Sequence, residues 1–142
     1  MGDLKLTYQV DGGDLVQAGE ASSQMKMTLK KLGLPPEIIR KASVCMYEGE
    51  INMVIHADGG RVEVEVGMDA ITIRLIDQGP GIPDVDRAME EGYSTAGDVA
   101  RDLGFGAGMD LPNMKRYSDE MRIDTTVGVG TTVTMRIDIN NG

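Results

Sequence analysis

Three polar side chains, Glu48, Asn52 and His56, recur at intervals of four residues in the middle of the chain. On an α-helix the positions i, i+4 and i+8 share one face, so a carboxylate, an amide and an imidazole would be stacked along it. Polar groups on an otherwise apolar helix face are costly to bury without partners. A bound metal–ligand complex would supply those partners, whereas a solvated helix face is the ordinary alternative.

Two glycine clusters lie downstream, Asp-Gln-Gly-Pro-Gly at 77–81 and Gly-Phe-Gly-Ala-Gly at 104–108. Glycine lets the backbone approach a ligand closely and adopt positive φ. The second cluster precedes an expected helix, whose N-terminal N–H groups and partial positive charge suit phosphates. The sequence has no P-loop motif, and the second cluster does not follow a strand of a βαβ unit, which disfavours a dinucleotide fold.

Asp77 continues the alternating apolar series of a strand expected at 71–77, so we expect its side chain on the buried face. A buried aspartate needs a partner. The carboxylate could accept a hydrogen bond from the exocyclic amine of adenine, and the glycines at 79 and 81 would let the base lie against the backbone. A strand-ending turn before the proline is the alternative.

Composition limits the class of protein. The 142 residues have the length of one ordinary domain, and we expect 1–142 to fold as a single unit. A formal net charge of −9 disfavours nucleic acid, whose phosphates attract basic surfaces. No apolar run reaches membrane-spanning length and no signal-peptide pattern is present, which predicts a cytoplasmic protein without membrane contact. The single cysteine, Cys45, is expected to be a small apolar residue inside a helix.

Alternation and helical spacing predict the elements that position these residues. We expect strands at 4–10, 62–66, 71–77, 121–127 and 131–139, and helices at 15–32, about 35–56, 85–91 and 109–117. Asp14 is the expected N-cap of the first helix, and Gly33 is its expected stop. Hairpins dominate this order, so we expect an α+β fold, a two-layer α/β sandwich with a mixed, mainly antiparallel sheet and helices on one face.

In order, the chain presents the polar helix face, Asp-x-Gly-x-Gly at 77–81, a glycine-rich segment at about 92–108 and Gly-Thr-Thr at 130–132. This order resembles the GHKL ATPase superfamily, whose members include gyrase-type ATPases, Hsp90 and the histidine-kinase catalytic domain. The likeness covers nearly the whole chain. Among the branches, the chain most resembles the small anti-sigma-factor serine kinases, through Gly-Tyr-Ser-Thr at 92–95 and Met-Lys-Arg-Tyr-Ser-Asp-Glu at 114–120.

The resemblance implies a role for each motif position. Asn52 would ligate Mg²⁺ bridging the phosphates of ATP, and Glu48 would be the general base that orients an attacking hydroxyl or water. Asp77 would bind the adenine amine, with Thr131 supporting the base. Further implied nucleotide contacts are Gly79 and Gly81 at the base, Ser94 and Thr95 from a mobile lid at about 92–108, and Gly104, Gly106 and Gly108 at the phosphates.

The function that the resemblance implies is that of an ATP-dependent serine/threonine protein kinase of the anti-sigma regulatory type. It would phosphorylate a small antagonist protein similar to anti-anti-sigma factors. An alternative from another class is an ATP-dependent binding module that sequesters a sigma factor or another partner without useful kinase turnover. Further candidate partners are a sigma factor and a second copy of this chain, forming a homodimer. Because His56 is the only histidine, histidine autokinase activity is disfavoured, and we expect His56 to cap the helix end.

Overall fold

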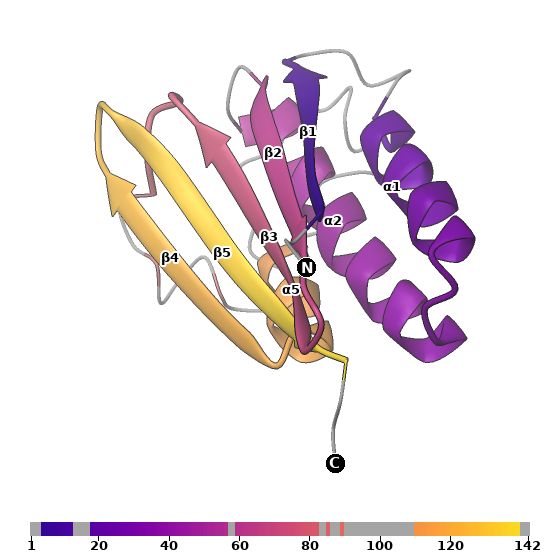
Figure 1. Ribbon diagram of the computed structural model, residues 1–142. Helices are drawn as coiled ribbons and strands as arrows, with labels where there is room; N and C mark the ends of the chain where they lie inside the picture. The colour runs from indigo at the N-terminus through magenta and orange to yellow at the C-terminus, as the bar shows by residue number, and fades with distance from the viewer. Residues whose placement is uncertain are drawn as a thin grey trace.

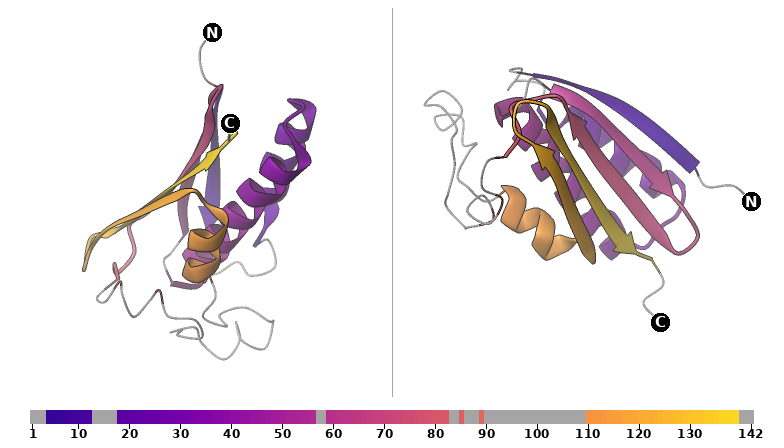
Figure 2. Two further views of the ribbon diagram at one scale, coloured as in Figure 1. Left: turned by 90° about the horizontal axis from the view of Figure 1, so that it is seen from below. Right: turned by 90° about the vertical axis from the view of Figure 1, so that its left-hand side faces the viewer.

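The computed structural model describes residues 4–12, 18–56, 59–82, 85, 89 and 110–139. In these residues one five-stranded sheet carries its helices on a single face (Figure 1, Figure 2). The elements are β1 (Leu4–Asp11), α1 (Glu20–Lys31), α2 (Pro36–His56), β2 (Gly59–Val66), β3 (Ala70–Asp77), α5 (Asp110–Tyr117), β4 (Glu120–Thr126) and β5 (Gly130–Asp138). The predicted α+β sandwich is confirmed.

The strand order is β1-β2-β3-β5-β4, and every pairing among the described strands is antiparallel. The sheet is therefore not mixed in this part of the chain. Two tight connections explain most of the order, because β2 is joined to β3, and β4 to β5, by short turns that favour antiparallel neighbours. The β3–β5 register places Asp77 opposite Thr131, which brings together two predicted site residues that are far apart in the chain.

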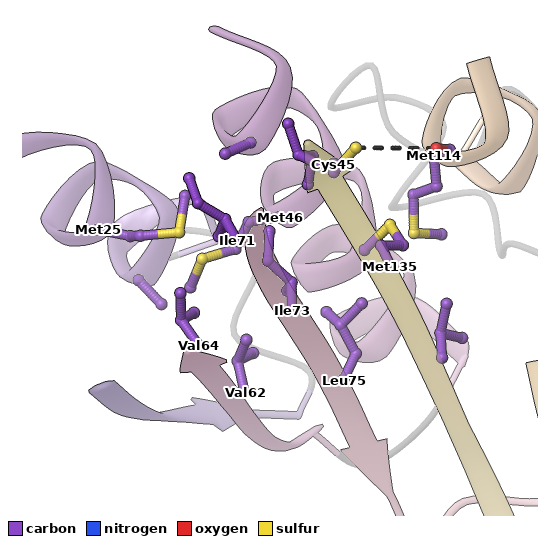
Figure 3. Packing of buried hydrophobic residues seen from close by; sticks show 14 of the residues in the cluster. Met25, Cys45, Met46, Val62, Val64, Ile71, Ile73, Leu75, Met114 and Met135 are labelled. Atoms are coloured by element: carbon purple, nitrogen blue, oxygen red, sulfur yellow. Dashed lines mark hydrogen bonds between the residues drawn. The ribbon is translucent and has the colours of Figure 1, made fainter. Parts of the chain in front are cut away.

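The core lies between the sheet and the helices (Figure 3). Because side chains alternate across a strand, every second residue of β2, β3 and β5 faces the helices, and most of these residues are buried. Methionine supplies much of the filling, since its flexible thioether adapts to irregular gaps between a twisted sheet and helices. The fully buried methionines are Met25, Met46, Met53, Met114 and Met135.

The first helix begins later than the sequence indicated. Gly19 has φ +99° and precedes the first helical residue, Glu20, so the prediction of a helix from position 15 with Asp14 as N-cap is wrong. Asp14 itself lies outside the described residues. The cap comes instead from α2, where the carboxylate of Glu50 accepts hydrogen bonds from the N–H groups of Gly19, Ala21 and Ser22 at 3.0, 3.2 and 3.0 Å. Local spacing could not reveal a cap from another helix.

The other boundaries agree with the sequence to within a few residues. Gly33, at φ +75°, follows the end of α1 as predicted. Val127 is wrong as a strand residue, because it lies in the β4–β5 turn with 63% of its surface exposed. The helix predicted at 85–91 and the segment 92–108 lie outside the described residues, apart from Val85 and Met89. These two are joined by a helical hydrogen bond from the Met89 N–H to the Val85 carbonyl at 3.0 Å.

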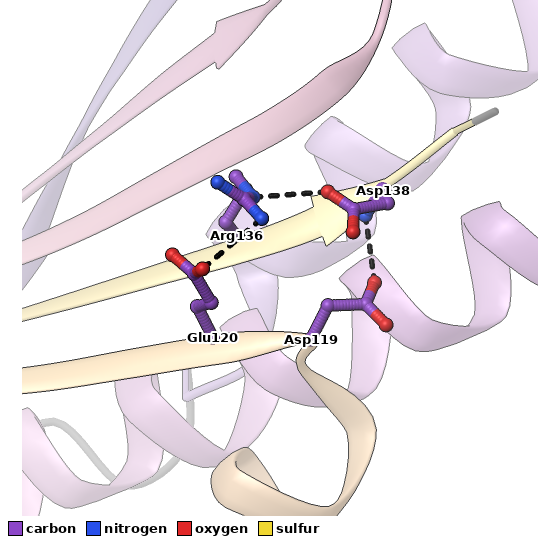
Figure 4. A network of polar contacts seen from close by, with 4 residues as sticks. All are labelled: Asp119, Glu120, Arg136 and Asp138. Atoms are coloured by element: carbon purple, nitrogen blue, oxygen red, sulfur yellow. Dashed lines mark hydrogen bonds and ion pairs between the residues drawn. The ribbon is translucent and has the colours of Figure 1, made fainter. Parts of the chain in front are cut away.

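A polar network ties the C-terminal end of α5 to the sheet (Figure 4). The Asp119 N–H donates to the carbonyl of Arg136 at 2.8 Å, and the Asp119 carboxylate accepts from the Asp138 N–H at 2.7 Å. The Arg136 guanidinium pairs with Glu120 and Asp138 at 3.2 and 2.9 Å. Exposed ion pairs add little stability, about 0–1 kcal/mol each. The two hydrogen bonds of Asp119 matter more here, because they fix where α5 leaves the helical layer.

Candidate active site

The helices α2 and α5 pack as an antiparallel pair. Near the start of α2, the Arg40 guanidinium lies over the ring of Tyr117, 5.5 Å from the ring centroid. Further along, Cys45 Sγ donates to the carbonyl oxygen of Met114 over 3.7 Å (Figure 3). Residue numbers thus rise along α2 in the direction in which they fall along α5, so the two helices are antiparallel. The second half of α2 therefore runs towards the N-terminus of α5.

Glu48 continues this series and lies against the first turn of α5. Its Oε1 accepts a hydrogen bond from Nδ2 of Asn113 at 3.3 Å, and both side chains are half-buried. Asn52, also half-buried, lies one helical turn further along the same face, about 6 Å beyond Glu48 at 1.5 Å per residue. The predicted pair thus extends towards the N-terminus of α5, and the partial positive charge of a helix N-terminus suits phosphate.

Cys45, three residues before Glu48, is fully buried and poorly suited to act as a nucleophile. Burial raises the pKa of the Cys45 thiol to about 12, and the negative charges of Asp119 and Glu48 add to the effect. The reactive form of cysteine is the thiolate, which this surrounding disfavours at neutral pH. The thiol is a buried, apolar part of the α2–α5 contact, as the sequence predicted.

Asp77 ends β3 and is half-buried. Its Oδ1 accepts hydrogen bonds from the N–H groups of Gly79 at 2.9 Å and Thr131 at 3.2 Å. The first bond is the strand-ending turn that the sequence left as an alternative to ligand binding, and the second ties β3 to β5. Within the described part of the chain, Asp77 Oδ2 has no hydrogen-bond partner. The carboxylate can therefore form the turn with one oxygen and accept from a ligand with the other.

Thr125, which the sequence reasoning missed, holds the neighbouring loop in place. Its Oγ1 accepts from the Ile82 N–H at 2.9 Å and lies 2.8 Å from Thr131 Oγ1. Gly81 has φ +81°, and a Cβ there would meet the Thr126 carbonyl oxygen at 2.6 Å, so this close approach requires glycine. Thr125 continues the less exposed series of Met121 and Ile123 along β4, and this alternation was the signal that could have found it.

The end of β3 packs directly on α2. A Cβ added at Gly49 would overlap the side chain of Leu75. A Cβ added at Gly60 would lie 2.6 Å from Met53 Cε and 3.1 Å from Asp77 Cα. Since Gly49 follows Glu48 in sequence and Met53 follows Asn52, the polar helix face and Asp77 lie at the same end of the helix–sheet sandwich.

The described members of the predicted site form two groups, and five further members lie outside the described residues. The first group is Glu48 and Asn52 on α2, and the second is Asp77, Gly79, Gly81 and Thr131 at the end of β3 and the start of β5. A cavity of about 390 Å³ opens beside the second group and is lined by residues 77–78, 124–126 and 129–132. The members outside the described residues are Ser94, Thr95, Gly104, Gly106 and Gly108.

Comparison with known proteins identifies the class. The model of the histidine kinase-, DNA gyrase B-, and HSP90-like ATPase family matches residues 44–141, a range that contains both groups of site residues. The chain therefore belongs to this ATPase family, and the resemblance predicted from its motifs is confirmed. No helix in the described part of the chain combines the length and apolar character needed to span a membrane.

Two relatives indicate which members of this family the chain is similar to. The chain is 34% identical over 108 residues to the serine/threonine-protein kinase RsbT of Bacillus subtilis (strain 168), covering 73% of this chain and 75% of the relative. It is 30% identical over 129 residues to an anti-sigma F factor of Clostridium beijerinckii, covering 85% and 87%. The structure is also similar to the mycobacterial sensor histidine kinase MprB, with TM-score 0.54, 15% identity and coverage of 95% and 97%, a likeness of fold alone.

Proposed function

We propose that this chain is an ATP-dependent serine/threonine protein kinase of the anti-sigma regulatory type. It transfers the γ-phosphoryl group of Mg-ATP to a small anti-anti-sigma-like antagonist protein. The observation that carries the proposal is Glu48, a half-buried carboxylate within the family-matched residues, one helical turn from Asn52 and against the first turn of α5. Similarity over 73% of the chain to a relative named as a serine/threonine-protein kinase supports the same activity.

Glu48 is assigned the role of general base. Its carboxylate accepts the proton of the acceptor hydroxyl while that oxygen forms a bond to the γ-phosphorus. The bond from phosphorus to the β–γ bridging oxygen breaks at the same time, and ADP carries away the electron pair. Because Oε1 already accepts from Asn113, Oε2 is the oxygen assigned to the nucleophile.

Asn52 is assigned as the protein ligand of Mg²⁺. Its side-chain oxygen is the hard donor that Mg²⁺ prefers, and this ion commonly binds through one or two protein ligands together with waters and substrate phosphates. The described residues fit that pattern through Asn52, whose half-buried side chain lies one helical turn from Glu48. When bound, Mg²⁺ supplies positive charge that offsets the charge of the phosphates.

The second group is assigned to the adenine. Asp77 Oδ2 accepts from the exocyclic amine, while Gly79, Gly81 and Thr131 support the base. The glycines at 104, 106 and 108, with Ser94 and Thr95, are assigned to the phosphates from a lid at about 92–108. These last assignments rest on the motif order alone.

A second candidate function is an ATP-dependent binding module that sequesters a sigma factor or another protein partner without kinase turnover. The relative named an anti-sigma F factor, 30% identical across 85% of this chain, favours it. The two candidates share the nucleotide site and differ in whether Glu48 acts on a hydroxyl.

Transfer of labelled γ-phosphate to a purified anti-anti-sigma domain separates them, with inorganic phosphate release as a second readout. Glu48→Ala is expected to keep its nucleotide affinity and to lose about 10²–10⁴-fold in transfer rate, because a base acts on the nucleophile and not on ATP. Asn52→Ala is expected to lose Mg²⁺-dependent binding as well. Glu37→Ala, at an exposed position in the first turn of the same helix, is the control and should change neither.

The outcomes are distinct. If the unmodified protein binds both ATP and the acceptor domain but transfers nothing, the binding-module function replaces the kinase. If Glu48→Ala transfers phosphate at the unmodified rate, Glu48 is structural and the assigned mechanism is wrong.

A further inference from the structure

The Asn113 side chain touches the proposed base directly. Asn113 Nδ2 lies 3.3 Å from Glu48 Oε1, although the two residues are 65 positions apart in the chain. The last torsion of a glutamate side chain is broad and roughly two-fold, so a lone carboxylate samples many orientations. A single donor on one oxygen restricts that rotation and determines where the other oxygen points.

The backbone that carries Asn113 is held firmly. On the same helix Leu111 and Met114 are buried, at 5% and 0% exposure, and the Met114 carbonyl accepts from Cys45. The C-terminal end of α5 is tied to β5 by two hydrogen bonds of Asp119, one from its backbone N–H and one to its carboxylate. The amide donor is therefore presented from a fixed position and does not depend on a mobile chain.

We propose that Asn113 is a positioning residue for the Glu48 carboxylate, holding Oε1 so that Oε2 faces the acceptor hydroxyl. The inference rests on the proposed function, because it gives Asn113 a role only if Glu48 acts as a base. An amide suits this role better than lysine or arginine would. It donates a hydrogen bond without placing a positive charge beside the carboxylate that must accept a proton.

Helix–helix packing is the other explanation of the contact, and a double-mutant cycle separates the two. The quantities to be measured are kcat and the KM for ATP, with the anti-anti-sigma domain as acceptor. The cycle compares the unmodified chain, Asn113→Ala, Glu48→Gln and the double variant. Misplacing a reacting group by about 1 Å can cost about 100-fold in rate, so Asn113→Ala is expected to lower kcat by about 10- to 100-fold. The KM for ATP should stay within about twofold, since the nucleotide contacts are unchanged.

The decisive comparison is made in the Glu48→Gln background. Glu48→Gln leaves no base for Asn113 to orient. Adding Asn113→Ala to this variant should therefore change the residual rate by less than about twofold, because the effects of substituting residues that act as a unit are strongly non-additive. Asn113→Gln keeps an amide donor and should recover part of the rate. Asn113→Leu keeps a similar size without a donor and should match Asn113→Ala.

Gln24→Ala is the matched control. Gln24 Nε2 donates to Glu20 Oε1 at 3.2 Å, an amide–carboxylate bond of the same kind on the exposed face of α1, and its loss should leave kcat unchanged. Thermal unfolding verifies that each variant is folded. An equal loss of kcat in both Glu48 backgrounds, or recovery of the rate by Asn113→Leu, would overturn the inference.

Failure of the inference and failure of the proposed function give different results. If the unmodified chain is active and Asn113→Ala matches it, only the role of Asn113 is wrong. If the unmodified chain transfers phosphate neither to the acceptor domain nor to water, the kinase function is wrong and Asn113 has no base to position.

Discussion

The substitution Asp77→Asn tests the adenine assignment with little disturbance of the fold. Asp77 Oδ1 accepts from the N–H groups of Gly79 and Thr131, and the amide oxygen of asparagine can accept both bonds in the same place. The change therefore falls on Oδ2, because this acceptor oxygen is replaced by an NH₂ donor. This donor faces the amine of adenine, which is also a donor, whereas guanine presents a carbonyl oxygen at the equivalent ring position.

The magnitude is that of losing one hydrogen bond to a charged acceptor, about 1.5–3 kcal/mol. This energy corresponds to about 10- to 100-fold weaker ATP binding. At an ATP concentration 100 times the unmodified Kd, binding stabilises the fold by about 2.7 kcal/mol, and a 100-fold weaker Kd leaves only about 0.4 kcal/mol. A 10-fold weaker Kd leaves about 1.4 kcal/mol, so over the expected range the ATP-induced rise in Tm falls by about 3–9 °C for a domain of this size.

Thermal unfolding with Mg-ATP and Mg-GTP measures the effect in the unmodified protein and in Asp77→Asn. In Asp77→Asn the rise in Tm caused by ATP should be smaller than in the unmodified protein, whereas the rise caused by GTP should not decrease. Asp124→Asn is a matched carboxylate-to-amide control, because Asp124 lines the same cavity but is exposed and paired with Arg122 at 3.0 Å. An unchanged ATP shift in Asp77→Asn would mean that Asp77 serves the turn alone. Equal shifts by ATP and GTP in the unmodified protein would refute the adenine assignment altogether.

Two further predictions concern stability. Glu50→Ala should lower the free energy of unfolding by about 3–5 kcal/mol in urea titration, because the buried N–H groups of Ala21 and Ser22 lose their acceptor. The exposed Glu20→Ala should stay within about 0.5 kcal/mol, and a Glu50→Ala loss below about 1 kcal/mol would contradict the account. Because burial raises the pKa of Cys45 from 9.0 to about 12, its contribution to stability is complete below pH 9 and is lost as the pH rises towards 12. Because the thiol is buried and little thiolate forms at pH 8, native protein should not react with a thiol reagent until it is unfolded. Rapid labelling of the native protein would disprove the burial.

Local rules predicted the elements well because the signals lie within each element. The proline pair at the start of α2 and the long helical spacing after it predicted a helix over about 35–56, and the structure has Pro36–His56. Period-two alternation predicted that Asp77 and Thr131 point inwards, and both side chains lie on the helix-facing side of the sheet. The predicted start of α1 was wrong because the helix is preceded by Gly19 and not by a residue with a capping side chain.

The sequence by itself determined which residues share a face of one helix or strand, because the periods of 3.6 and 2 depend only on the local backbone. That sufficed to pair Glu48 with Asn52 and to turn Asp77 inwards. Only the tertiary structure decided which faces meet. The Glu50 cap of α1, the Thr125 contact with Ile82 and the Asn113 contact with Glu48 each join residues 28 or more positions apart. Such contacts arise from the packing of whole elements, and the period within one segment does not reveal which residue of another segment it will meet.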